Sequence, residues 1–173
     1  MRFILKNEHE SPVELIAEQA EVHRLLAPGQ ELVVEWTWSG RAALTCATGR
    51  LTLSVPPGGT IEVTEPAPGD AMKLWGSEPL PGGTAVHEFG IHNATGEPLD
   101  TFWEPWCGEG DIPPNGDPMR VEWTENSTGA GIAYHPGLVV LWDVTGSCRA
   151  WQPDGTEVGT GGFLHGEPRD EAG

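Results

Sequence analysis

Val34-Glu35-Trp36-Thr37 and Val121-Glu122-Trp123-Thr124 are the same four residues, 87 positions apart in a chain of 173 residues. The residues before the first of these stretches also recur, 86 positions later. One extra residue in the second copy, Asn115, then raises the offset to 87. The matches at an offset of 86 pair Asn7 with Asn93, Pro12 with Pro98, Glu18 with Glu104 and Pro28 with Pro114. Four consecutive identities that include a tryptophan, in register with further matches, indicate an internal duplication.

The composition around this repeat favours short strands joined by tight turns. The chain has 24 glycines and 16 prolines, which are costly inside helices and strands and useful in turns. Runs rich in β-branched and aromatic residues, typical of strands, occur at Glu31–Thr37, Arg50–Val55, Thr60–Thr64, Ala85–His92 and Leu138–Val144. We therefore predict an all-β protein with two small antiparallel β lobes of about six short strands each. The lobes lie side by side or are fused into one sandwich or barrel.

The segment 11–26 allows two interpretations. Ser11-Pro12-Val13-Glu14 offers an N-cap serine, a proline at the first helical position and a capping glutamate, which favours a helix. The matching stretch of the second copy has Pro105 in its interior, where proline breaks a helix. Because related copies share a backbone, we predict a strand at Val13–Glu18, with a helix confined to the first copy as the alternative.

The duplication divides the chain into two repeats. The first covers residues 1–65 and the second residues 84–158. Residues 66–83 between them are rich in proline and glycine, a composition that resists regular structure and is typical of a connection. Residues 159–173 contain few core-forming residues, so we expect a loose C-terminal tail.

The second copy combines an asparagine and a proline with two further motifs. In chain order these are Asn93, Pro98, Glu104-Pro105-Trp106 and Pro113-Pro114-Asn115-Gly116. The pattern resembles that of small uncharacterised bacterial all-β proteins, over about 30 residues of each copy. The first copy departs from it with Glu18-Gln19-Ala20. This resemblance implies an all-β fold and brings no function with it. The low lysine content is also typical of a high-GC bacterial gene, or of halophilic adaptation.

The charge balance excludes several classes of partner. The chain has 26 acidic and nine basic residues, a formal net charge of −17. A field of this sign repels phosphate, so general binding to nucleic acid or to anionic membranes is not expected. The apolar stretch at Phe3–Leu5 is too short for a secretory signal, and no run approaches the roughly 20 apolar residues that cross a bilayer. We therefore expect a cytoplasmic protein. Its cysteines, Cys46, Cys107 and Cys148, are then reduced thiols in the core or in strands.

The second repeat carries most of the excess acid. Residues 97–125 contain eight acidic residues and one basic residue, Arg120, with aromatic residues between them. Carboxylates beside exposed aromatic rings attract cations by Coulomb and cation–π interactions. The candidate binding residues are Phe102, Trp103, Glu104, Trp106, Asp111 and Glu122. A solvated acidic face with its tryptophans in the core is the simpler interpretation. The repeated Trp36 and Trp123 are most simply core residues.

A metal centre is the alternative site. His87 and His92 lie in the richest histidine stretch, and His135 is a more distant candidate ligand. Small β-barrels of the cupin type hold a transition metal with two histidines that share one strand face. His87 and His92 are five residues apart, so they face opposite ways unless Gly90 forms a bulge.

These features lead to three competing hypotheses. The preferred one is a binding protein without a cofactor, which presents the acidic, tryptophan-rich surface of its second repeat to a basic protein or cationic ligand. The first alternative is a small cupin-like β-barrel enzyme, with or without one transition metal ion, that acts on a small molecule. The second is a structural or assembly subunit. The sequence leaves both enzymatic activity and oligomeric state open.

Overall fold

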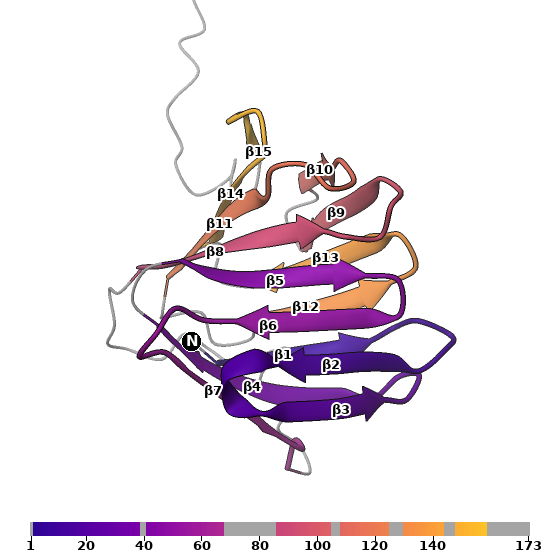
Figure 1. The fold of residues 1–173 in the computed structure, drawn as a ribbon. Coiled ribbons are helices and arrows are strands. Elements are labelled where there is room, and N and C mark those ends of the chain that lie inside the picture. The colour runs from indigo at the N-terminus through magenta and orange to yellow at the C-terminus, as the bar shows by residue number, and fades with distance from the viewer. Residues whose placement is uncertain are drawn as a thin grey trace, which may run out of the picture.

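The strands of the chain form two sheets that pack face to face (Figure 1). The computed structural model describes residues 2–38, 41–67, 86–104, 108–124, 130–143 and 148–158. One sheet has seven strands, in the spatial order β10 (Gly108–Ile112), β9 (Leu99–Glu104), β13 (Leu138–Asp143), β12 (Ala130–His135), β1 (Arg2–Asn7), β4 (Glu31–Thr37) and β7 (Thr60–Thr64). The other has eight, in the order β15 (Glu157–Val158), β14 (Cys148–Trp151), β11 (Met119–Thr124), β8 (Val86–Asn93), β5 (Ala42–Ala47), β6 (Arg50–Ser54), β2 (Val13–Ala17) and β3 (Val22–Leu26).

The predicted all-β class is confirmed, and the protein is one fused sandwich that does not close into a barrel. The prediction that the strands are all antiparallel is wrong. Both sheets are mixed, because four of the described strand pairs are parallel: β1 with β12, β5 with β8, β2 with β6 and β9 with β13. A 3₁₀ turn, η1 (Glu18–Ala20), links β2 to β3. No helix in the described part of the chain has the length and apolar character to cross a membrane.

The duplication is visible strand by strand. Strands β1 to β7 of the first repeat correspond in order to β8 to β14 of the second, and the pairings within each repeat are the same. The junctions also correspond, because β1 pairs with β12 as β8 pairs with β5. A pseudo-twofold relation therefore exchanges the two sheets, and each sheet contains strands of both repeats (Figure 1).

The predicted repeat boundaries can be placed on these strands. Strands β1 to β7 lie within residues 1–65, and β8 to β15 within residues 84–158. All but two residues of the connection 66–83 lie outside the described residues, as does the whole tail 159–173.

The strand predicted at Val13–Glu18 is present as β2, which ends at Ala17 because Glu18 begins η1, and its counterpart in the second repeat is the strand β9. In β2, Val13, Leu15 and Ala17 are buried while Glu14 and Ile16 are half-buried, which is the two-residue period of a strand. β2 lies between β3 and β6, which satisfy its backbone hydrogen bonds. Tertiary pairing therefore outweighs the local helix-start pattern.

The core between the sheets is built on aromatic residues from both repeats. Trp36 and Trp123 are fully buried, which confirms them as core residues. Their rings lie 5.4 Å and 6.3 Å from the ring of Phe89, measured between centroids. Burying a tryptophan removes roughly 150–250 Å² from water, worth about 4–6 kcal/mol at ~25 cal/mol per Å². The repeated tryptophan therefore stabilises the fold.

A buried asparagine occupies the same place in each repeat. The side-chain amide of Asn7 donates to the carbonyls of Leu26 and Ser11, at 3.0 and 3.1 Å. That of Asn93 donates to the carbonyls of Ile112 and Glu97, at 2.7 and 2.8 Å. Each side-chain oxygen accepts from the backbone N–H two residues later. The matching asparagines of the two copies thus hydrogen-bond the end of β1 to the hairpin of β2 and β3, and the end of β8 to the hairpin of β9 and β10.

Candidate functional site

A hollow of about 480 Å³ opens on the outer face of the seven-stranded sheet, at its β10 edge. It is lined by Asp100, Thr101 and Phe102 of β9, Glu109, Gly110 and Asp111 of β10, Leu138 of β13 and Gln152. Phe102 and Asp111 are among the residues predicted for a cation-binding surface. We call this feature the β9–β10 hollow.

Strand alternation decides which side chains reach the hollow. Leu99, Thr101 and Trp103 are buried towards the core, so Asp100 and Phe102 project from the outer face. The antiparallel register places Asp111 opposite Asp100, and Glu109 opposite Phe102. Three carboxylates therefore gather around a half-buried aromatic ring.

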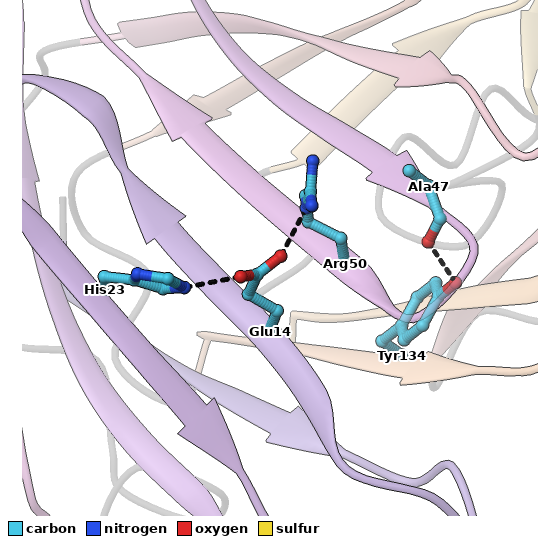
Figure 2. Close-up of polar contacts among 5 residues, drawn as sticks. All are labelled: Glu14, His23, Ala47, Arg50 and Tyr134. Atoms are coloured by element: carbon cyan, nitrogen blue, oxygen red, sulfur yellow. Dashed lines mark hydrogen bonds and ion pairs between the residues drawn. The ribbon is translucent and has the colours of Figure 1, made fainter.

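The first repeat has a different chemistry at the corresponding place (Figure 2). There Glu14 of β2 lies between His23 of β3 and Arg50 of β6. Its two carboxylate oxygens lie 2.5 Å from His23 Nε2 and 2.5 Å from Arg50 Nε. Hydrogen bonds from Arg50 and then from His23 lower the pKa of Glu14. One acid in the first repeat is thus matched by two basic side chains.

The second repeat replaces the basic side chains of this cluster. Glu14 corresponds to Asp100, but His23 corresponds to Glu109 and Arg50 to Leu138. In addition, Leu25 corresponds to Asp111. Within the described ranges, no Lys, Arg or His side chain forms an ion pair with the three carboxylates of the hollow. The two repeats share a backbone here and differ in charge.

The structure brings together only some of the predicted binding residues. Trp103 is 2% exposed and belongs to the core, so its ring is not part of a surface. Glu104 ends β9, and Trp106 lies outside the described residues. Glu122 lies on β11 in the other sheet, where its carboxylate is 3.6 Å from Arg120 and its Cα pairs with that of Arg149. Phe102 and Asp111 are therefore the predicted residues that line one hollow.

The three candidate metal ligands point in different directions. His87 lies on the core side of β8, where its ring is 4.9 Å from that of Trp38. His92 lies on the outer face of the eight-stranded sheet, and His135 on the outer face of the other sheet. The described residues contain no group of three or more His, Cys, Asp or Glu side chains arranged to hold a metal ion.

The cysteines lie partly within the described chain. Cys46 is a free, fully buried residue of β5, and burial raises the pKa of its thiol to about 12. A thiol with this pKa stays protonated at neutral pH and is a poor nucleophile. Cys148 begins β14, while Cys107 lies outside the described residues.

Sequence reasoning missed Asp100, Glu109 and Leu138. Their signal is a difference between the repeats, not a motif, because Asp100 keeps the acid of Glu14 while Glu109 and Leu138 take the places of basic residues. Aligning β2 with β9, β3 with β10 and β6 with β13 would have revealed the exchange of basic for acidic or apolar residues.

Comparison of the chain with models of protein families, with curated proteins and with solved structures gives no match.

Proposed function

We propose that the protein is a cytoplasmic binding protein whose β9–β10 hollow receives a lysine or arginine side chain of a basic partner. The observation that carries the proposal is the exchange between the repeats. The position of the balanced Glu14 cluster is occupied in the second repeat by carboxylates without a basic partner in the described chain.

The hollow suits a long cationic side chain for two reasons. Phe102 and Leu138 provide apolar surface for a methylene stem, and such stems pack on apolar surface while their charged ends stay solvated. Asp100, Glu109 and Asp111 surround this surface with negative charge, and the ring of Phe102 adds a cation–π contact. A net charge of −17 also speeds the approach of a basic protein.

The carboxylates of the hollow lower the stability of the fold. A destabilising arrangement that the first repeat avoids supports a role in binding. Asp100 and Asp111 are register partners, and like charges directly opposite one another destabilise an antiparallel pair. The first repeat avoids this cost with Glu14 opposite Leu25.

The test measures binding of an oligolysine peptide at low and at physiological salt by isothermal titration calorimetry. The variant carries Asp100→Asn, Glu109→Gln and Asp111→Asn. The matched control carries Glu10→Gln, Glu21→Gln and Glu62→Gln, three exposed acids that remove the same charge elsewhere. We expect the first variant to bind at least about tenfold more weakly, which is the effect of losing charged hydrogen bonds. The control should bind less than about twofold more weakly, because salt screens its distant charges.

Equal weakening in both variants would mean that the peptide responds to net charge alone, and would reject the hollow as the site. Absence of binding by the unmodified protein at low salt would reject a cation-binding role. Far-UV circular dichroism of each variant verifies that the fold is retained.

A further inference from the structure

A second hollow, of about 450 Å³, lies on the outer face of the eight-stranded sheet. Its floor includes Ala43 of β5 and Gly90 of β8, which are register partners. Around this floor stand Arg41, Glu88, His92, Pro118 and Arg120. We call this feature the Gly90 hollow.

The floor is low because Gly90 lacks a side chain. Phe89 and Ile91 point into the core, so residue 90 faces outward. The first repeat has Ile4 at this position, and its side chain is fully buried. A Cβ atom at Gly90 would lie 3.2 Å from His92 Nε2 and 3.3 Å from Pro118 Cβ, so even alanine crowds the floor.

Two arginines at this hollow keep hydrogen-bond donors available. Arg41 Nε lies 3.8 Å from a carboxylate oxygen of Glu88, and Arg120 Nη1 lies 3.6 Å from one of Glu122. These separations exceed hydrogen-bond distance. By contrast, Arg149 gives two hydrogen bonds to Glu157, at 2.8 and 3.1 Å. In the described part of the chain, Arg41 and Arg120 therefore have long ion pairs and no hydrogen-bonded partner.

The surroundings orient the donors of Arg120, while the side chain of Arg41 is 90% exposed. The guanidinium of Arg120 lies 3.8 Å above the ring of Trp151, a flat surface that limits its rotation. The ring of His92 lies beside the floor, and burial lowers its pKa. A neutral imidazole has one N–H donor and one acceptor. The lining of the hollow thus combines two guanidinium groups and an imidazole with one carboxylate, that of Glu88, and the carboxylate of Glu122 lies just outside it, 3.6 Å from Arg120.

We propose that the Gly90 hollow binds a small anion through a carboxylate or phosphate group. Guanidinium groups match the planar oxygen pairs of both, and two of them hold such a group from different sides. The ligand must be small, because the net charge of −17 repels extended polyanions. Salt screens charges beyond roughly 8 Å, so the anion responds chiefly to the groups at the hollow, which are the two arginines with the carboxylates of Glu88 and Glu122 beside them.

The test follows the backbone amide resonances of Ala43 and Gly90 by NMR in chloride buffer. Inorganic phosphate is added in one arm and succinate in the other. We expect saturable shifts at both amides, and the tighter-binding probe identifies phosphate or carboxylate as the preferred group. Arg41→Gln and Arg120→Gln should each weaken binding about tenfold or more, the effect of losing a charged hydrogen bond.

Arg149→Gln is the matched control, because Arg149 also contacts the ring of Trp151, at 4.8 Å, but does not line the hollow. The Arg149→Gln variant should change the affinity for the anion less than about twofold, because the loss of one positive charge outside the hollow has little effect on binding within it. Gly90→Ala should weaken binding with no change of charge. Absence of saturable shifts with both probes would overturn the proposal. So would equal losses in Arg149→Gln and Arg120→Gln. If Gly90→Ala does not fold, the three arginine variants still decide.

Discussion

The carboxylate of Glu14 accepts hydrogen bonds from Arg50 and His23, which hold its pKa below the ordinary value of 4.5. The three residues come from adjacent strands, β6, β2 and β3 (Figure 2). A carboxyl whose pKa is lower in the folded chain than in the unfolded chain stabilises the fold at pH values above its pKa in the unfolded chain. That stabilisation disappears as the pH falls through the folded pKa.

We therefore expect Glu14→Gln to lower the melting temperature at pH 7 and to have a smaller effect at pH 3, below the ordinary pKa of 4.5. The change at pH 7 is small, because exposed ion pairs contribute little to stability. Differential scanning calorimetry of both proteins at the two pH values measures it. Asp100→Asn, at the matching position of the second repeat, is the control and should not lower the melting temperature at pH 7. A deficit in Glu14→Gln that stays constant with pH would show that the carboxylate charge is not its cause.

At the residue scale, the sequence indicated which residue types gather at the site better than it indicated which way their side chains point. It placed Phe102 and Asp111 on a candidate surface but also Trp103, which alternation turns towards the core. The inward direction is set by pairing of β9 with β13 and β10, which a single sequence does not reveal.

At the scale of elements, the duplication was the most useful predictor. Residues 11–26 favour a helix when taken alone, yet the repeat showed that β2 and β9 must share one conformation. Proline cannot occupy the interior of a helix without loss of a hydrogen bond and a steric clash. The parallel pairs, such as β2 with β6, were not predicted, because strand signals give no direction of pairing.

The buried asparagines provide a test at this scale, because each joins a strand end to the next hairpin. Asn7→Ala leaves the buried carbonyl of Leu26 without its side-chain donor, and Asn93→Ala does the same for Ile112. An unsatisfied buried acceptor costs about 1–3 kcal/mol, so each variant should lose about this much free energy of unfolding. Urea unfolding of both variants measures the loss.

Thr52→Ala is the control for these variants, since Thr52 is a half-buried strand residue without a side-chain hydrogen bond among the described residues. It should cost less than either asparagine variant. Matching losses at Asn7 and Asn93 would confirm that the two hairpins are fastened equally. A loss at one site only would contradict the equivalence of the repeats.

At the scale of the whole molecule, the arrangement of the repeats was the least predictable feature. Lobes side by side and one fused sandwich both agree with a duplicated sequence. The structure is the fused form because β1 pairs with β12 and β5 with β8, across the two repeats. These pairs join residues far apart in sequence, and the aromatic core crosses the same boundary through Trp36 and Phe89. Neither repeat therefore completes a sheet by itself.

This arrangement predicts that the chain stays assembled after it is cut between the repeats. A site-specific protease sequence placed within residues 68–85 allows cleavage without change to any described strand. We expect the two fragments to elute together from a size-exclusion column in native buffer, because both parallel junctions and the shared core persist. They should separate in denaturant. Each fragment alone should unfold without a cooperative transition, since its share of the core tryptophans is exposed to water. Separate elution of the fragments in native buffer, each with its own cooperative transition, would show instead that the repeats fold independently.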